Sequence, residues 1–453
     1  MGNRNITSEE VKLCWRSLEE LGFFGGLKLE PTPSWMTDTW GAIREIRRGT
    51  LELDAAGEVN LLVALPERFP FHKPLFFVFP GDDLGMLPHV EPDGYVCYVD
   101  DEQLLLDTSN PAGILCEALA RVRKVLNQGV NGDNHQDFID EFEAYWGKHH
   151  PQRRKIVSFV TPTDEVRPIT VSGSKKKSRV EYLTPDPSLP TWFLPKVRQR
   201  ELAFRRAMFV PLSHGSVVQP PPYGEMWNIA EMRAVIQRCL TTNNRKRLKE
   251  HASRIHGPNH YTLFAVPRPS GGYACFGVEF RGKGPRKHRS HPLDTEDADF
   301  ELCPLTVARF DRDYLIERGG GELELAERHV LLVGCGAVGS VIADQLAKTG
   351  VGKLTLIDPD RLGPENTFRH TLGLGANTSK VEAIKKDLER KLPYLEITAE
   401  PTRVEDHLGA KPQYLEQFDL IVVAIGNPTI ELLLNKHLHR SRDNPPAVFS
   451  WLD

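Results

Sequence analysis

Hydrophobic and polar positions recur with different periods along the chain, and the changes of period divide it into regions. Residues 7–22 open with a capping-box sequence and carry apolar residues at helical spacing, which predicts an amphipathic helix. Alternation over residues 46–53 and 59–65 predicts two strands, and a helical stripe over 114–125 predicts another helix. This order of helix, strands and helix indicates an α+β domain over residues 1–148.

The pattern becomes less regular from residue 149, where prolines and a lysine run indicate a linker that enters a second domain. A long polar helix is predicted over residues 226–256, and strands are predicted over 260–310. We therefore expect an α/β linker domain over residues 149–322, to which no motif assigns chemistry. The basic loop 281–291 lacks interleaved aromatic residues, so we interpret it as a solvated turn and expect no nucleic-acid partner.

Residues 323–453 return to a clear pattern. An apolar strand at 330–333 is followed by a glycine-rich loop, a helix that ends near residue 348 and a second apolar strand at 353–357. Two more apolar runs near the end of the chain extend this βαβ unit. We expect a partial α/β domain of the Rossmann type, with a doubly wound parallel sheet.

Composition and charge narrow the classes of protein. The chain has 453 residues, of which 26% are charged and 40% hydrophobic, and these values are typical of a globular protein with about three domains. A net charge of -4 gives no general attraction to nucleic acid or anionic membranes. The sequence has no long apolar run and no apolar leader, so we expect a cytoplasmic protein. Seven widely spaced cysteines disfavour a disulfide scaffold or a zinc site.

The glycine-rich loop is the first candidate for chemistry. Gly334, Gly336 and Gly339 fit the G-x-G-x-x-G pattern between a strand and a helix, where backbone amides approach a phosphate closely. Asp358 ends the second strand and is placed to accept a hydrogen bond from a ribose hydroxyl. These residues predict nucleotide binding, and both NAD and ATP remain open at this point.

Polar residues downstream favour a triphosphate. A triphosphate that is attacked at its α-phosphorus develops charge that calls for positioned cations and a metal ion. Arg369 and Lys380 supply cations, and Asn366 supplies a neutral donor. Asp358 or Asp360 would contact a metal ion or the ribose. Each residue alone could be an ordinary exposed polar group, whereas the ordered set favours a site.

This ordered set resembles the adenylating domain of ubiquitin-activating and ThiF-type enzymes over residues 328–453. The resemblance implies that ATP, with Mg²⁺, is used to adenylate the C-terminal glycine of a protein, and that the domain forms a homodimer. It carries ATP-binding roles onto Gly334, Gly336, Gly339, Asp358, Asp360, Asn366, Arg369 and Lys380, with Arg369 also catalytic. The family commonly has an Asp-Asn pair after the fourth strand, but this chain has Gly426-Asn427, so no magnesium ligand is carried over there.

The family's domains also continue past the point that corresponds to Asp453 and include a thioester-forming cysteine. We therefore expect an incomplete adenylating domain that does not complete the activation cycle alone. Cys335 lies inside the glycine loop, where we expect it to pack beneath the phosphates rather than act as the nucleophile.

A second candidate is Cys97, which follows a turn in the first region. From its position alone, a buried structural cysteine and a reactive one are equally supported. The order P-x-x-F-P-F-x-x-P, His89, G-x-V-C and Asn110-Pro111 resembles the ubiquitin-conjugating fold over residues 7–148. The resemblance places Cys97 at the thioester-carrying position and His89 at the catalytic site, although we favour a structural donor role for His89.

Two sequence features near Cys97 differ from those expected around an activated thiol. Val90 and Glu91 replace the Pro-Asn that follows the family's histidine, so the oxyanion role of that asparagine is unassigned. Acidic residues at 100–102 follow Cys97, so we expect no strongly lowered pKa for its thiol. Thioester exchange tolerates this, because a free cysteine is already partly thiolate at neutral pH. Cys116 lies on a packed helical face and is the weaker candidate.

A conjugating-type domain, a linker domain and an adenylating domain on one chain resemble the fused activating and conjugating proteins of bacterial anti-phage CBASS operons. The resemblance implies adenylation, thioester transfer to Cys97 and conjugation to target lysines of a protein with a C-terminal glycine, by analogy a cGAS-like nucleotidyltransferase. Two other classes stay open: an NAD-dependent oxidoreductase and a non-catalytic binding scaffold.

Overall fold

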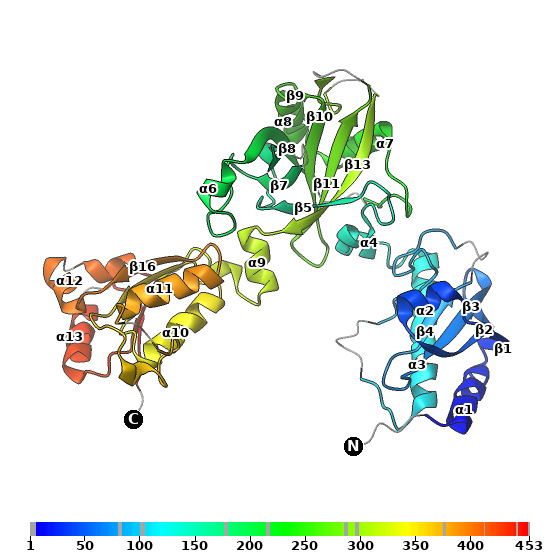
Figure 1. The fold of residues 1–453 in the computed structure, drawn as a ribbon, viewed down its shortest axis with the longest axis horizontal. Coiled ribbons are helices and arrows are strands. Elements are labelled where there is room, and N and C mark those ends of the chain that lie inside the picture. Colours follow the sequence, from blue (N-terminus) through cyan, green and yellow to red (C-terminus); the bar gives the residue numbers. More distant parts are fainter. Residues whose placement is uncertain are drawn as a thin grey trace. The chain divides into compact units, whose positions relative to one another are not determined.

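A computed structural model describes residues 6–79, 84–99, 105–175, 180–213, 218–284, 289–294, 299–374, 377–411, 413–440 and 443–451. The chain forms two compact units, each described here by itself (Figure 1). Unit 1 comprises Met1–Arg154, Asp164–Val166 and Phe209–Thr306, and unit 2 comprises Lys155–Thr163, Arg167–Met208 and Val307–Asp453. The middle of the sequence therefore contributes residues to both units.

The N-terminal part of unit 1 is an antiparallel sheet in the order β1-β2-β3-β4 with helices around it. Its elements are α1 (Ser8–Glu19), β1 (Phe24–Glu30), α2 (Ser34–Trp40), β2 (Ile43–Leu53), β3 (Gly57–Pro66), β4 (Leu75–Val78), α3 (Pro111–Asn131), α4 (Asp137–Asp140) and α5 (Phe142–Tyr145). The predicted capping box of α1 is present, because the Glu10 N–H donates to Thr7 Oγ1 at 3.2 Å and the Thr7 N–H donates to Glu10 Oε2 at 2.8 Å. The predicted α+β domain is thus confirmed.

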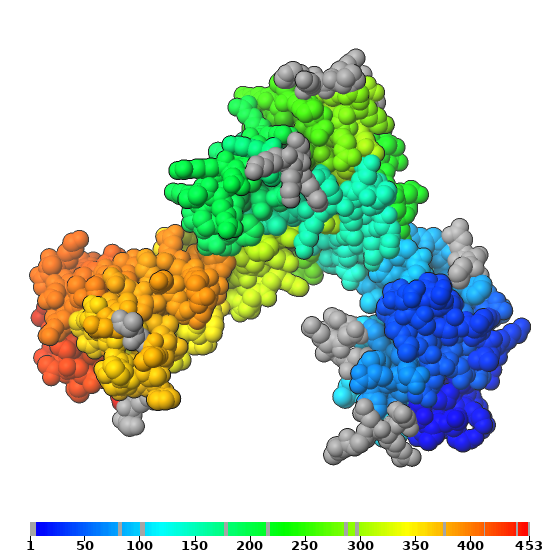
Figure 2. Space-filling model, in the orientation of Figure 1, coloured from blue at the N-terminus to red at the C-terminus, as the bar shows by residue number. Residues whose placement is uncertain are grey.

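The core of this part lies between the sheet and the long helix α3. Asn110 caps α3 by accepting a hydrogen bond from the Gly113 N–H at 3.0 Å, and Pro111 follows at the first helical position, where a missing N–H costs nothing. Leu115, Leu119 and Val122 recur at helical spacing and are fully buried. The space-filling view shows this region, in blue to cyan, as a packed body (Figure 2).

The rest of unit 1 combines two helices with a second antiparallel set of strands, in which β10 pairs with β11 and β11 with β13. The elements are α7 (Ile229–Cys239), α8 (Thr242–Ala252), β9 (His256–Gly257), β10 (Asn259–Pro267), β11 (Tyr273–Gly282), β12 (Arg289–Ser290) and β13 (Phe300–Arg309). The single long helix predicted over 226–256 is wrong. Leu240 is extended, and the Thr241 side chain accepts the Asn244 N–H and starts a new helix.

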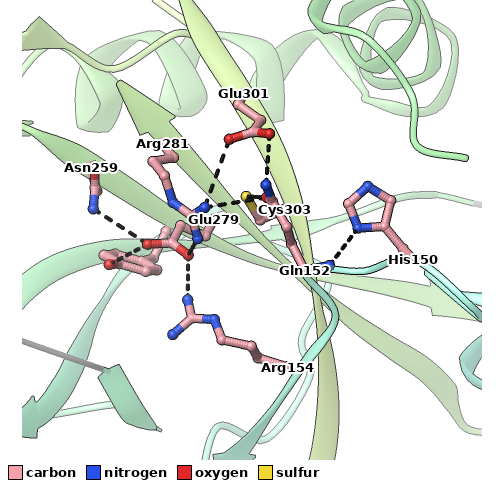
Figure 3. Close-up of polar contacts among 9 residues, drawn as sticks. His150, Gln152, Arg154, Asn259, Glu279, Arg281, Glu301 and Cys303 are labelled. Carbon is pink, nitrogen blue, oxygen red and sulfur yellow. Dashed lines mark hydrogen bonds and ion pairs between the residues drawn. The ribbon is translucent and has the colours of Figure 1, made fainter. Parts of the chain in front are cut away.

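A buried carboxylate joins the strands of unit 1 to the segment 152–154 (Figure 3). Glu279 on β11 accepts from Tyr261 Oη at 2.9 Å and from Asn259 Nδ2 at 3.3 Å. It also pairs with Arg281 at 3.1 Å and with Arg154. Two cations and two neutral donors therefore compensate a side chain that is only 5% exposed.

The same network reaches Gln152 (Figure 3). Gln152 donates to Glu301 at 2.8 Å, and its carbonyl accepts from the Cys303 thiol at 2.7 Å and from Arg281 at 3.3 Å. Burial raises the pKa of the Cys303 thiol to about 11, so it stays protonated as a donor at neutral pH. The segment 152–154 is thus anchored to β11 and β13 in unit 1.

Unit 2 begins with short strands from the middle of the sequence. They are β5 (Arg154–Ser158), β6 (Arg167–Ser174), β7 (Val180–Thr184) and β8 (Leu202–Pro211), accompanied by the short helix α6 (Lys196–Gln199). β7 pairs parallel with β5 and antiparallel with β6. An aromatic group of Phe159, Phe193 and Phe310 packs beside them, with ring centroids 4.9–6.0 Å apart.

The remainder of unit 2 is a parallel sheet in the order β16-β15-β14-β17-β18, as predicted for a Rossmann-type domain (Figure 1). Its elements are α9 (Arg312–Arg318), η2 (Leu323–Leu325), β14 (His329–Val333), α10 (Ala337–Lys348), β15 (Lys353–Ile357), η3 (Pro364–Asn366), α11 (Lys380–Lys391), β16 (Glu396–Glu400), α12 (Val404–Ala410), η4 (Tyr414–Gln417), β17 (Leu420–Val423), α13 (Pro428–Leu438) and β18 (Ala447–Phe449). The central strands are buried on both faces, as expected of a parallel sheet. Across the described parts of both units, no helix is long and apolar enough to span a bilayer.

Candidate functional site

In the glycine loop between β14 and α10, the backbone conformation and packing require glycine at two of the three glycine positions. Gly334 has φ of 91°, and a Cβ there would lie 2.5 Å from the Ala424 carbonyl oxygen. A Cβ on Gly339 would collide with the Gly334 carbonyl. At Gly336 a Cβ would meet nothing within 4 Å, so this position faces open space. Gly336 is the N-cap of α10 and offers no side chain, which leaves the helix N-terminus open to a phosphate.

Asp358 and Lys380 sit together behind this loop. The Asp358 carboxylate accepts the Cys335 N–H at 2.7 Å and the Asp360 N–H at 2.8 Å, so it orders both the glycine loop and the turn after β15. Lys380 Nζ lies 2.8 Å from Asp360 Oδ2 and 3.9 Å from Asp358 Oδ1. The lysine is only 7% exposed, and its two carboxylate partners hold a buried cation beside the loop.

These residues line a cavity of about 350 Å³ at the carboxyl ends of the strands, where open α/β sheets bind ligands. Gly334, Gly336, Asp358, Asp360 and Lys380 were predicted from the sequence and all line it. The cavity is large enough for part of a nucleotide, and its polar groups and open helix N-terminus fit a phosphate-bearing ligand.

The sequence analysis missed Arg403, which also lines the cavity. It lies three residues beyond the end of β16, and the parallel order of the sheet brings that end to the same edge as Gly334. β16 was not predicted from the sequence, so no predicted strand end marked Arg403.

Three predicted residues do not line this cavity. One is Gly339, which packs against the Gly334 carbonyl within the loop, and the others are Asn366 and Arg369. Asn366 is buried and accepts the Gly363 N–H at 2.9 Å, which closes the short helix η3. Arg369 is exposed and lies after that helix. The nucleotide-binding roles of all three residues, and the catalytic role of Arg369, stay predictions.

Cys335 and His370 are buried next to each other at the glycine loop. The Cys335 thiol is fully buried, and burial together with the Asp358 charge raises its pKa, so it is no nucleophile, as expected. His370 Nδ1 accepts the Leu372 N–H at 3.2 Å, which leaves Nε2 to donate to the Cys335 carbonyl at 3.0 Å. Desolvation lowers the pKa of His370 and favours this neutral form.

A preformed metal centre is not found at the cavity. Within the described ranges, no group of three or more His, Cys, Asp or Glu side chains could hold a metal ion. Gly426 donates its N–H to Glu431 at 3.0 Å, and Asn427 caps α13 with its side chain. The turn after β17 therefore contributes no carboxylate of its own, as the sequence indicated.

Cys97 lies at the end of a small hairpin in unit 1. Val90 and Val96 form an antiparallel bridge, and the Cys97 N–H donates to the His89 carbonyl at 2.8 Å. All seven cysteines of the chain lie in the described ranges, and of these Cys97 alone is exposed. Cys116 is half-buried, and its burial raises the pKa of its thiol, which agrees with its rejection as the nucleophile. The acidic residues 100–102 lie outside the described residues.

His89 is tied to the helices that follow α3. It has a positive φ of 63°, and its N–H donates to Tyr145 Oη at 2.9 Å. Its ring Nε2 lies 3.0 Å from Asp137 Oδ2, and Nδ1 lies 3.8 Å from Glu141 Oε2. These contacts fit the structural donor role favoured from the sequence, and a catalytic role for His89 stays a prediction.

The two residues that replace the family's Pro-Asn are held by partners far along the chain. Glu91 forms an ion pair with Lys148, and the Val90 carbonyl accepts a hydrogen bond from Tyr223 Oη at 2.9 Å. Neither Lys148 nor Tyr223 was predicted, because nothing in their local sequence marks them.

Comparison with known proteins finds a family match for each of the two regions. Residues 43–154 match the family described as Prokaryotic E2 family B, and residues 311–445 match the ThiF family. The chain therefore carries an E2-like region and a ThiF-type region, which confirms the predicted fusion and its fold classes. The residues between the two matches are assigned to neither family.

Three relatives illustrate the range of similarity. The chain is 27% identical to the ATP-dependent ubiquitin transferase-like protein Cap2 of Pseudomonas aeruginosa, over 78% of this chain and 64% of that protein. It is 25% identical to Cap2 of Escherichia coli, over 76% of this chain and 63% of that protein. It is 31% identical to the molybdopterin-synthase adenylyltransferase of Salmonella typhimurium, over 30% of this chain and 55% of that protein. The chain thus spans less than two thirds of the length of both Cap2 relatives.

Proposed function

We propose that this chain is part of an ATP-dependent transferase that activates the C-terminal glycine of a protein and conjugates it to an amine through Cys97. One observation carries the proposal: the one exposed thiol among the seven cysteines, Cys97, lies within an E2-like region of a chain that also has a ThiF-type region with a cavity that fits a phosphate-bearing ligand. The names of the Cap2 relatives support the combination.

The cavity of unit 2 supports the activation step. The glycine carboxylate would attack the α-phosphorus of ATP, forming a C–O–P bond as the bond to pyrophosphate breaks. Gly336 and the N-terminus of α10 offer space and amide donors to the phosphates, and Lys380 and Arg403 supply positive charge. Mg²⁺ would arrive with the phosphates, since it is usually held by one or two carboxylates and substrate oxygens. Asp360, 67% exposed at its side chain, is the best placed carboxylate.

The hairpin of unit 1 supports the transfer step. The Cys97 thiolate would attack a thioester carbonyl carbon, forming a new C–S bond while the old one breaks and the departing thiol takes up the proton. A target lysine would then attack the Cys97 thioester, and an isopeptide bond would replace the C–S bond. This step requires no strongly lowered thiol pKa, because a free cysteine is already partly thiolate at neutral pH.

The finer parts of the proposal extend the resemblance to anti-phage systems. The conjugated protein would be a cGAS-like nucleotidyltransferase with a C-terminal glycine, the acceptors would be lysines, and the complete protein would work as a cytoplasmic homodimer. No residue described here selects among these partners.

The test uses a full-length version of the transferase of which this chain is part, together with ATP and a protein ending in glycine. We expect pyrophosphate exchange that depends on the glycine terminus, and a reductant-sensitive adduct that Cys97→Ala abolishes. An adduct that survives Cys97→Ala would sink the assignment of Cys97. Tight NADH binding without pyrophosphate exchange would favour an oxidoreductase. Failure of Cys97 to accept an acyl group from any glycyl thioester would favour a binding scaffold.

A further inference from the structure

The hairpin that ends at Cys97 is held from outside the E2-like region. Residues 209–306 belong to the same compact unit, and no family or motif assigns them chemistry. Their turn at Pro222–Glu225 docks on the end of the E2-like region, where the Gly224 N–H donates to the Lys148 carbonyl at 2.9 Å. This contact brings Tyr223 to the hairpin.

Tyr223 completes a set of hydrogen bonds along one strand of the hairpin. The His89 N–H donates to Tyr145, the His89 carbonyl accepts from the Cys97 N–H, and the Val90 carbonyl accepts from Tyr223. The rings of Tyr145 and Tyr223 lie 6.1 Å apart between centroids. The backbone on which Cys97 rests is therefore fixed by two tyrosine hydroxyls, one of which comes from a distant part of the chain.

Both hydroxyls keep their protons under ordinary conditions. Burial raises the pKa of Tyr145, and burial together with the neighbouring Tyr145, Glu91 and Glu141 raises the pKa of Tyr223. Tyr223 Oη must donate, because the Val90 carbonyl can only accept. The contact is thus a permanent hydrogen bond at any pH at which the thiol works.

The hydrogen bond from Tyr223 to the Val90 carbonyl lies next to the Cys97 site. Val90 and Glu91 stand where the resembled family has the Pro-Asn that shapes its thioester site, and here the same segment is secured by Tyr223 and Lys148. We infer that Tyr223 is a positioning residue, which orients the Cys97 hairpin for attack on a thioester. This inference rests on the proposed function of Cys97. Small displacements of a reacting group cost large factors in rate, so one hydroxyl suffices to matter.

The test separates orientation from simple thiol reactivity. The full chain is given the 2-mercaptoethanesulfonate thioester of a glycine-terminated peptide, without ATP, and acyl transfer to Cys97 is followed by mass spectrometry. Tyr223→Phe removes only the hydroxyl and keeps the ring. We expect its transfer rate to fall about fivefold, the equivalent of one lost hydrogen bond, while alkylation of Cys97 by iodoacetamide stays within about twofold.

Tyr273→Phe is the matched control, because Tyr273 also donates from its hydroxyl in unit 1, to Asp164 at 3.0 Å, and has no described contact with the hairpin. It should transfer at the wild-type rate, and thermal melting of both variants reports any loss of folding. Transfer at the wild-type rate in Tyr223→Phe would overturn the inference and leave the proposed function standing. Parallel losses in transfer and alkylation would also overturn it. A wild-type chain that accepts no acyl group would instead overturn the function of Cys97 itself.

Discussion

In the nucleotide cavity, side chains meet because each follows the end of a parallel strand. Gly334 follows β14, Asp358 follows β15, Arg403 follows β16 and Ala424 follows β17. The Cys97 hairpin is different. Its contacts come from Tyr145 at the end of α5 and from Tyr223, which lies more than a hundred residues beyond Cys97 in the chain.

This difference concerns how each site is made rigid. The cavity inherits its geometry from the sheet, so local changes within it should affect ligand binding more than folding. The hairpin inherits its geometry from the packing of unit 1, so changes in distant residues should reach it.

The largest effect is expected from Glu279, the buried carboxylate that anchors unit 1 (Figure 3). Glu279→Ala leaves Arg154 and Arg281 without their shared acceptor, and breaking such a buried pair costs about 3–5 kcal/mol. Urea unfolding followed by tryptophan fluorescence should show unit 1 unfolding earlier. The control is Glu301→Ala, whose carboxylate is 41% exposed in the same network and should cost about 1 kcal/mol or less. Equal costs for the two variants would contradict the buried anchor.

Lys380→Met should separate the two sites most clearly. Removing a buried cation aimed at the developing phosphate charge is expected to slow pyrophosphate exchange about 10²–10³-fold. Acyl transfer from a synthetic thioester to Cys97 should not change, because Cys97 lies in the other unit. Lys348→Met is the control, since Lys348 is exposed and pairs only with Asp344 among the described residues. Exchange at the wild-type rate in Lys380→Met would remove the lysine from the activation step.

The same comparison explains what the sequence could predict. The βαβ unit and Asp358 were found because a parallel sheet brings the carboxyl ends of its strands together, and this rule needs only the strand order. Lys380 was predicted from the ordered set of polar residues and the family that the set resembles, and the thioester-carrying role of Cys97 was predicted from a resemblance in motif order. By contrast, Tyr223 lies in a proline-rich turn that carries no pattern, and only the folded unit brings it to Val90.

Two other differences between the sequence-based predictions and the structure have local causes. The helix expected over 226–256 breaks at Leu240 because Thr241 caps a new helix, and a polar periodic stretch conceals such a break. Asn366 was assigned to the nucleotide, but its side chain is used to close a turn. Asn favours both ligand contacts and turns, so its residue type alone does not distinguish the two roles.

Acid should destabilise unit 1 through a buried histidine, His260. Burial lowers the pKa of His260 in folded unit 1 to about 4. In the unfolded chain the same histidine binds a proton near pH 6.5, so protonation favours unfolding below that pH. The stability that neutral His260 confers is therefore complete above pH 6.5 and lost as the pH falls toward 4, by up to about 3 kcal/mol. Melting curves at pH 7.5 and 4.5 should show a smaller acid loss in His260→Gln than in the wild type. His256→Gln, at an exposed histidine whose charge contributes least to the lowered pKa of His260, should retain most of the loss, and an unchanged loss in His260→Gln would contradict the assignment.

The smallest effect tests whether the cavity binds phosphate where the glycine loop is open. A Cβ at Gly336 meets no protein atom within 4 Å, so Gly336→Ala should change stability by no more than about 0.5 kcal/mol. The added methyl would occupy space that a phosphate needs, and we expect ATP affinity, measured by calorimetry, to fall about tenfold, or about 1.4 kcal/mol. Gly334→Ala provides the contrast, because its positive φ and the nearby Ala424 carbonyl make it costly to folding itself, by about 1–3 kcal/mol. If Gly336→Ala bound ATP as tightly as the wild type, the phosphates would have to lie elsewhere in the cavity, and Lys380 and Arg403 rather than the loop amides would hold them.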